Sequence, residues 1–182
     1  MLHSSKSLRL PHYTTLEHLE GKGNYAVKRY YQFPFSWFYK KKLKMIVELL
    51  GDKKYYNILD YGCGSGIFLT ELQRHAQRVV GYDVGDPFNP AWKFDVIVLG
   101  SVLEFTNVQY VLNQVKSILK PGGLIVGASP MTTALSQAYF KLIGDTNYRH
   151  KHLHIQRVLM ENFPQVKFKE WMGLYFSFRA TV

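Results

Sequence analysis

The stretch from Asn57 to Phe68 reads "NILDYGCGSGIF" and leads from an apolar run into three glycines at alternate positions, Gly62, Gly64 and Gly66. Glycines at these positions let the chain turn sharply and let a ligand approach the backbone, because no Cβ atoms stand in the way. A helix that begins after the turn would offer unpaired N–H groups to the same ligand. The stretch therefore predicts a ligand site at the end of a strand.

The segments around this turn alternate between short apolar runs and runs with helical spacing. Strands are predicted over 55–61, 78–84, 94–100, 124–129, 166–172 and 174–182, the last two hinged at Gly173. Helices are predicted over 67–77, 108–120, 132–143 and 154–162. Strands that alternate with helices require crossover connections. We therefore predict the α/β class, with a doubly wound, mostly parallel sheet and an antiparallel C-terminal hairpin.

The region before the first strand differs from the rest of the chain. A lead-in with a short helix near 14–19 precedes an amphipathic helix that begins at Ser36 and ends near Gly51. The stretch 27–44 interleaves aromatic side chains with lysines, and we expect an aromatic cap whose lysines lean outward, toward an anionic acceptor or a membrane. At 182 residues the chain is predicted to form a single domain, 1–182, with a helical cap and lead-in over 1–50 and the ligand-binding core over 51–182.

The net charge of +10 is unevenly distributed. Residues 1–56 carry 11 Lys/Arg against 4 Asp/Glu and residues 141–182 carry 7 against 3, whereas the centre is nearly neutral. Basic flanks suit a phosphate, a nucleic acid or a lipid surface, or they are simply solvated. The sequence has no apolar run of transmembrane length and no secretory signal pattern, so we predict a cytoplasmic protein with at most peripheral membrane contact. The single cysteine, Cys63, excludes an intramolecular disulfide.

An acid stands two residues before the first glycine and helps to identify the ligand. Dinucleotide sites have the spacing G-x-G-x-x-G, but here it is G-x-G-x-G and Asp60 precedes it. An acid at this place repels a pyrophosphate and suits a cation. Asp83 ends the second strand, where a carboxylate can accept hydrogen bonds from both hydroxyls of a ribose. S-adenosylmethionine, an adenosine compound with a positive charge and no phosphate, meets these conditions.

Four segments then carry a family resemblance. They resemble, in order and approximate spacing, the successive motifs of class I S-adenosylmethionine-dependent methyltransferases. The four segments are "ILDYGCGSGIF", "VVGYDV", "FDVIVLGSVLEF" and "ILKPGGLIVGASP". The resemblance covers roughly residues 40–182 and is strongest to the small-molecule methyltransferases of this class. It implies a Rossmann-like fold, S-adenosyl-L-methionine as cofactor, and transfer of a methyl group to O, N or C of a small-molecule or lipid-like acceptor.

The resemblance also assigns roles to individual residues. It places Asp60 and the backbone of the glycine turn at the methionine end of the cofactor, and Asp83 at the ribose. Near the sulfonium it places the residues that follow the third strand, namely Gly100, Ser101 and Val102. Within the turn, Cys63 is expected to be a small packing residue rather than a nucleophile, because no basic residue adjoins it to lower its pKa.

Two departures from the family pattern qualify these roles. Only ten residues, "VGDPFNPAWK", separate Asp83 from Phe94, where the family has a further helix and strand. We therefore predict about six strands, with the second at or near an edge, and we name Asp86, Phe88 and Trp92 as candidates to hold the adenine. Alternatively, the two aromatic residues cover that edge. In the second departure, Phe105 occupies the position where the family often has a histidine.

A general base is needed only if the acceptor must lose a proton. The candidates are His150 and His152 in "YRHKHLH", in a loop expected to face the substrate; a solvated loop is the alternative. Alternating histidines could bind a metal, but Arg149 and Lys151 lie between them and no metal site is predicted. The competing functions are an RNA or protein methyltransferase that uses the basic flanks, and a non-catalytic S-adenosylmethionine-binding or scaffold protein.

Overall fold

A computed structural model describes residues 8, 10, 28–83, 86–89, 91–142 and 152–182. The helix expected near 14–19 lies outside these residues. Within the described part of the chain, no helix is both long enough and apolar enough to cross a membrane.

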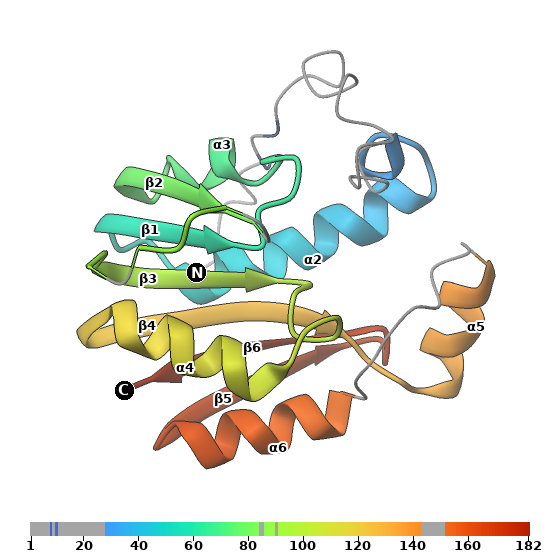
Figure 1. Cartoon of the computed structure of the whole chain (residues 1–182). Coiled ribbons are helices and arrows are strands. Elements are labelled where there is room, and N and C mark those ends of the chain that lie inside the picture. The colour runs from blue at the N-terminus through green and yellow to red at the C-terminus, as the bar shows by residue number, and fades with distance from the viewer. Residues whose placement is uncertain (1–7, 9, 11–27, 84–85, 90, 143–151) are drawn as a thin grey trace.

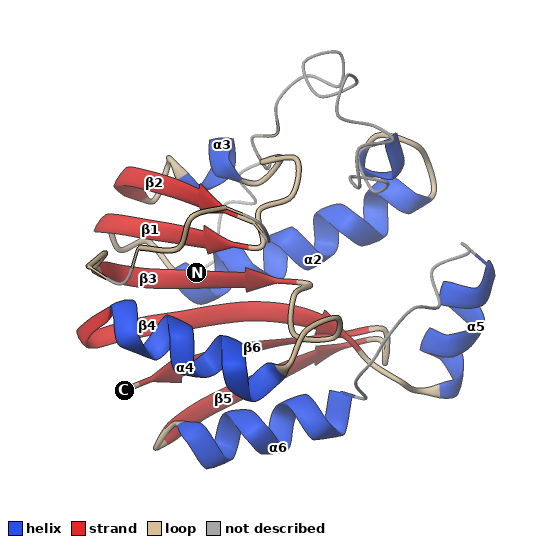
Figure 2. Cartoon of the chain, viewed as in Figure 1, coloured by secondary structure: helices blue, strands red, loops and turns tan. Residues whose placement is uncertain are grey.

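One six-stranded sheet organises the structure, with strand order β2-β1-β3-β4-β6-β5 (Figure 2). The strands are β1 (Tyr55–Tyr61), β2 (Ala76–Tyr82), β3 (Phe94–Gly100), β4 (Leu119–Pro130), β5 (Gln165–Trp171) and β6 (Tyr175–Thr181). The first four are parallel, and β6 runs antiparallel to both β4 and β5. The predicted six-stranded, mostly parallel sheet with its C-terminal hairpin is confirmed, as is the edge position of β2.

Helices cover both faces of the sheet (Figure 1). They are η2 (Lys28–Tyr30), α2 (Phe35–Leu50), α3 (Leu69–Leu72), α4 (Val108–Ile118), α5 (Ala134–Leu142) and α6 (His152–Asn162). Strand residues alternate between the two faces, so Ile58 and Val96 pack with α2, whereas Leu59 and Ile97 pack with α4 and α6. Each face thus has its own apolar core, and the doubly wound arrangement follows from this alternation.

The segment between β1 and β2 differs from the prediction of a helix over 67–77. The helix α3 has only four residues, and β2 already begins at Ala76. The reason lies in the sequence "QRHAQR" after Leu72, which has no large apolar residue that a longer helix could bury.

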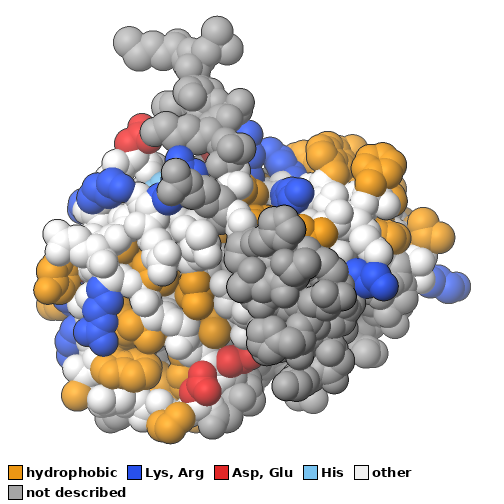
Figure 3. All heavy atoms as spheres, turned by 90° about the horizontal axis from the view of Figure 1, so that it is seen from above, with side chains coloured by type: hydrophobic (Ala, Val, Ile, Leu, Met, Phe, Trp, Pro, Cys, Tyr) orange, Lys and Arg blue, Asp and Glu red, His pale blue; other side chains and the backbone are white. Residues whose placement is uncertain are grey.

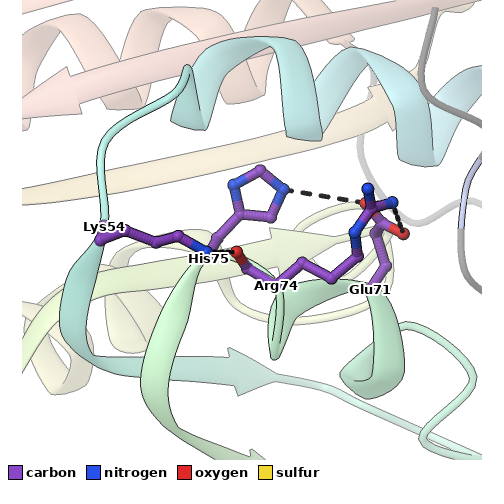
Figure 4. Close-up of polar contacts among 4 residues, drawn as sticks. All are labelled: Lys54, Glu71, Arg74 and His75. Carbon is purple, nitrogen blue, oxygen red and sulfur yellow. Dashed lines mark hydrogen bonds and ion pairs between the residues drawn. The ribbon is translucent and has the colours of Figure 1, made fainter.

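Polar contacts hold this short connection instead (Figure 4). The carboxylate of Glu71 is buried and both of its oxygens lie 3.3 Å from Nη1 of Arg74. Its Oε1 also lies 3.7 Å from Nε2 of His75, and Lys54 donates a hydrogen bond to the carbonyl of Arg74. Glu71 therefore ties the turn that leads into the edge strand.

Candidate functional site

The glycine turn follows β1 at the carboxyl edge of the sheet. Gly62, Gly64 and Gly66 have φ angles of 80°, 51° and 72°, a region that residues with a Cβ atom adopt only at a cost. The N–H groups of Gly62 and Cys63 donate to the carbonyl of Tyr82, at N···O distances of 2.7 and 3.0 Å. The turn is thus anchored to the end of β2, and these two amides, which the resemblance placed at the methionine end, are engaged within the fold.

Gly62 is the tightest position of this turn. A Cβ atom there would lie 2.3 Å from Cγ2 of Val102, and the positive φ adds strain. We expect Gly62→Ala to lower the free energy of unfolding by about 2–4 kcal/mol, from overpacking and from the left-handed backbone together. Chemical denaturation would measure this loss.

The matched control for this prediction is Gly62→Ala in a Val102→Ala background, which removes the clashing methyl group. The double variant should recover the overpacking part and keep the backbone part, about 1 kcal/mol. Equal losses in both backgrounds would contradict the contact.

Asp60 lies at the end of β1 and is only 4% exposed. Burial and the charge of Asp83 raise its pKa to about 7, against the opposing effect of the charge of Lys42. The structure therefore brings Asp60 and Asp83 together at the same edge, as expected for the carboxyl ends of neighbouring parallel strands. A buried acid with this pKa is poised to ionise when a cation approaches.

Lys42 contradicts the expectation that the lysines of the first helix lean outward. It is 4% exposed, and its Nζ donates a hydrogen bond of 2.7 Å to Oγ of Ser101. The helical spacing contains the signal that the sequence analysis missed, because Tyr39, Lys42 and Ile46 follow one another at three and four residues on the buried face of α2. Lys42 thus carries a positive charge from the N-terminal helix to the carboxyl edge of the sheet.

Glu104, in the loop after β3, was not assigned a role from the sequence either. It is 1% exposed, and burial raises its pKa to about 7, while Lys42 opposes that shift. Its Oε2 accepts a 2.9 Å hydrogen bond from Ser129 at the end of β4, and its Oε1 is buried without a hydrogen-bond partner in the described part of the chain. We refer to Lys42, Asp60 and Glu104 as the buried charge cluster.

The residues that the resemblance places near the sulfonium lie at the end of β3, and one of them, Ser101, contacts Lys42 of this cluster. Gly100 ends β3, Ser101 follows with a φ of 63°, and Val102 is buried against Gly62. Positive φ at a residue other than glycine stores strain and is commonly found at ligand sites. The hydrogen bond from Lys42 holds the side chain of Ser101, so the loop after β3 is fixed from the side of α2.

Beyond β2, the residues assigned to adenine have contacts within the fold. Oδ2 of Asp86 accepts a 2.7 Å hydrogen bond from the N–H of Asp83, so one of its carboxylate oxygens is engaged there. The ring of Phe88 lies 5.7 Å from that of Tyr82, edge-on, and the ring of Trp92 lies 6.1 Å from that of Phe94. Both Phe88 and Trp92 pack against the core, which is the arrangement expected of aromatics that cover the sheet edge.

Cys63 is half-buried within the turn. Burial raises the pKa of its thiol to about 12, and the carboxylates of Asp60, Asp83 and Asp86 add to the shift. Its Sγ would lie 2.9 Å from a Cβ atom at Gly81, so it fills the space that this glycine leaves. These surroundings suit a packing residue and oppose formation of a thiolate.

Of the two candidate bases, His150 lies outside the described residues. His152 is the first residue of α6, and its Nδ1 lies 3.0 Å from the N–H of Thr132, which donates to it, and 2.7 Å from Oγ1 of the same threonine. This contact assigns the ring hydrogen to Nε2, and burial lowers the pKa of the ring. His152 is therefore set to donate a hydrogen bond from Nε2. Among the described residues, no group of His, Cys, Asp and Glu is arranged to hold a metal ion.

The segment before the first strand covers Asp60. Tyr30 of η2 and Tyr39 of α2 are buried with ring centroids 4.6 Å apart. Burial raises the pKa of Tyr30, and the charge of Asp60 adds to the shift. Aromatic rings and one buried lysine thus close the site over the end of β1.

Comparisons with known proteins agree with this arrangement. A family model described as a methyltransferase domain matches residues 35–159. No curated protein matches the chain in sequence.

Solved structures with the same fold include three named enzymes. The N-methyltransferase NodS from Bradyrhizobium japonicum, in complex with S-adenosyl-L-homocysteine, is 19% identical, with 93% of this chain and 97% of that chain covered and a TM-score of 0.65. A possible histamine N-methyltransferase from Thermotoga maritima is 15% identical, with 90% and 98% covered and a TM-score of 0.61. Human N-acetylserotonin methyltransferase is 14% identical, with 94% and 62% covered and a TM-score of 0.61.

Proposed function

The chain belongs to the methyltransferase-domain family, and we propose that it transfers the methyl group of S-adenosylmethionine to an oxygen, nitrogen or carbon atom of a small-molecule or lipid-like acceptor. The observation that carries this proposal is the pair of acids at the glycine turn, the buried Asp60 and the half-buried Asp83. The turn offers close backbone approach, and the acids favour a cation with free ribose hydroxyls over a phosphate. The residues present therefore fit S-adenosylmethionine.

In this proposal each end of the cofactor has its own residues. Asp60 and the glycine turn face the methionine end, Asp83 binds the ribose, and Asp86 and Phe88 lie nearest to the adenine. Because the N–H groups of Gly62 and Cys63 donate hydrogen bonds to the carbonyl of Tyr82, the charge of Asp60 supplies most of the attraction at the methionine end. Gly100, Ser101 and Val102 border the sulfonium.

The cofactor supplies a methyl group already activated by positive sulfur, so the chain mainly has to position the acceptor and exclude water. The aromatic cap and Val102 supply the apolar enclosure. His152 would hold an acceptor through its Nε2–H, whereas the proposal of His150 as a base rests on the sequence alone. If the acceptor must lose a proton, the buried Oε1 of Glu104 is a second candidate to receive it.

Two observations favour a small acceptor over a nucleic acid. The named substrates of two structural neighbours, histamine and N-acetylserotonin, are small molecules. In this chain, a basic cavity of about 330 Å³ lies at the amino ends of β1 and β4, and its lining includes Lys53, Lys54, Lys120 and Arg179. That end is about 20 Å from the glycine turn, the length of a seven-residue strand, so a nucleic acid held there would not present a base to the methyl group.

Calorimetric titration with S-adenosylhomocysteine tests the cofactor assignment. Asp83→Ala should weaken binding by about 1–3 kcal/mol, because charge-assisted hydrogen bonds to the ribose are lost. The exposed Asp52→Ala is the matched control and should bind like the wild type. Unchanged affinity in a folded Asp83→Ala protein would refute the ribose assignment.

The same titration, followed by a methyl-transfer assay, distinguishes the proposed function from its alternatives. If wild-type protein binds neither S-adenosylmethionine nor S-adenosylhomocysteine, the proposed function is wrong. If it binds them but transfers no labelled methyl group to amine, phenol, carboxylate or lipid acceptors, the proposed acceptor class is wrong, and absence of transfer to RNA and protein as well would support the non-catalytic alternative.

A further inference from the structure

Half of the ten most exposed large hydrophobic side chains in the described residues gather around one end of α2. Near the start of that helix Phe33 is 87% exposed and Trp37 is 53% exposed. The neighbouring helix and the turn between β5 and β6 contribute three more, namely Leu135 at 56%, Leu142 at 84% and Met172 at 59%. We refer to these five side chains as the apolar face.

Aromatic contacts join the three elements beneath this face. The ring of Trp37 lies 5.1 Å from that of Trp171, which precedes Met172. The ring of Phe38 lies 4.5 Å from that of Tyr139 in α5 and 6.0 Å from that of Trp171. These rings therefore connect the start of α2, the helix α5 and the end of β5, the three elements that carry the exposed side chains.

The helix α5 is unusual in what it exposes. Ser136 and Phe140 are its buried residues, with the hydroxyl of Ser136 bonded to the carbonyl of Met131. Leu135 and Leu142, seven residues apart and hence on one side of the helix, point to solvent. An amphipathic helix that leaves leucines uncovered has an apolar surface available for a partner.

The segments that carry the apolar face contain lysines and no acid, and the nearest acids in sequence among the described residues are Glu48 of α2 and Glu170 of β5. Residues 33–44, 133–142 and 171–174 contain five lysines and no acid, and of these lysines only Lys42 is buried. Lys40 and Lys141 are exposed and form no ion pair with any described residue, and Nζ of Lys41 lies 5.9 Å from the ring of Trp171. Figure 3 shows lysine and arginine side chains beside hydrophobic ones at the right-hand end, where α5 lies in Figure 1.

We propose that the apolar face and its lysines dock this protein on an anionic lipid bilayer. Aromatic and aliphatic tips bordered by lysines match the boundary between acyl chains and anionic head groups. A second copy of the chain fits poorly, because lysines of both copies would then face each other. The buried charge cluster begins at Lys42, one helical turn beyond Phe38, so docking turns the carboxyl edge of the sheet toward the lipid.

Vesicle flotation tests this proposal with the whole chain. Wild-type protein should float with vesicles of equal parts phosphatidylcholine and phosphatidylglycerol, bind phosphatidylcholine alone at least tenfold more weakly, and be released by high salt. The double variant Lys40→Glu, Lys141→Glu should lower the partition coefficient at least tenfold, and Trp37→Ala with Leu142→Ser should do the same. All four side chains are exposed, so the fold should survive.

Matched controls come from exposed residues elsewhere. Lys167→Glu on β5 and Met160→Ser on α6 make the same kinds of change away from the apolar face and should leave partition within twofold of wild type. Failure of wild-type protein to bind anionic vesicles, or equal losses in the control variants, would overturn the proposal. A dimer that light scattering detects and that Trp37→Ala dissociates would assign the face to a second copy and also overturn it.

The docking proposal stands apart from methyl transfer, because its readout needs neither cofactor nor acceptor. Protein that binds vesicles but not S-adenosylhomocysteine would leave the docking intact and remove the proposed function. Protein that binds S-adenosylhomocysteine but no vesicles would overturn the docking proposal and leave the proposed function intact.

Discussion

Lys42→Met should lower the free energy of unfolding by about 3–5 kcal/mol at pH 8, the cost of breaking a buried ionic arrangement by removing one partner. At that pH Asp60 and Glu104, whose pKa values are raised to about 7, are largely ionised in the native protein. Without Lys42 their charges remain buried and uncompensated. Methionine keeps the length of the side chain, so the loss reports the charge and its hydrogen bond to Ser101 rather than a cavity.

The loss of stability caused by Lys42→Met should depend on pH, and the direction of the pKa shifts of Asp60 and Glu104 sets the sign of this dependence. Both carboxyls are more basic in the folded than in the unfolded protein, so they take up protons on folding and disfavour the folded state as pH rises from about 4 to about 7. Near pH 5 both are neutral in the native state, and the loss from Lys42→Met should shrink to about 1 kcal/mol. Urea denaturation at the two pH values measures the difference.

The control is Lys41→Met, on the next residue of the same helix. Its Nζ lies 3.9 Å from Glu48 and its side chain is 28% exposed, so the loss should stay below about 1 kcal/mol at either pH. Similar losses for the two lysines at pH 8 would show that Lys42 is not the compensating charge of the cluster.

Cofactor binding should release a proton, and this is the second large effect. If the methionine end of the cofactor brings a positive charge to Asp60, the pKa of that carboxyl falls from about 7 toward its usual range. Affinity for S-adenosylhomocysteine should therefore rise as pH increases from about 5 to about 7, by at most tenfold per pH unit. It should level off above the pKa of Asp60 in the folded protein without cofactor. Calorimetry in two buffers with different ionisation enthalpies would count the released protons.

The matched variant is Asp60→Asn, which keeps the shape of the side chain and cannot titrate. It should bind the cofactor more weakly at pH 7.5 and show a flat pH profile between pH 5 and 7. A wild-type slope that persists in this variant would assign the proton to another group, with Glu104 the next to test.

Most of the fold could be predicted because its signals are local. The strands β1 and β3 match their predicted bounds, since each is a short apolar run bordered by turn residues or charges. The helix over 67–77 could not be bounded in this way, because Ile67, Phe68 and Leu72 have helical spacing but fill the core around the glycine turn. The polar sequence after Leu72 then ends the helix early, whereas the burial of Glu71 depends on packing that no local pattern shows.

The residues of the candidate site also separate into those that the sequence could place and those that depend on long-range packing. Asp60, the glycines and Asp83 could be placed together because parallel strands bring their carboxyl ends to one edge. Lys42 shares its helical spacing with buried residues of α2, but its place in the site and that of Glu104 could not be predicted, because lysines and glutamates are rarely buried and the sequence does not show which helix lies over the end of β1. Their roles depend on how α2 packs against the sheet, which is a long-range property.

The hydrogen bonds from Gly62 and Cys63 to Tyr82 couple the opening of the glycine turn to the opening of the edge strand β2. Among the described strands β2 pairs with β1 alone, so we expect it to open at a lower free energy than the central strands. Each opening of β2 releases the turn, and a ligand that holds the turn must in return keep β2 closed. In the terms of amide hydrogen exchange, we expect the edge strand and the glycine turn to open as one cooperative unit, so that a ligand bound at the turn would raise the protection of the strand.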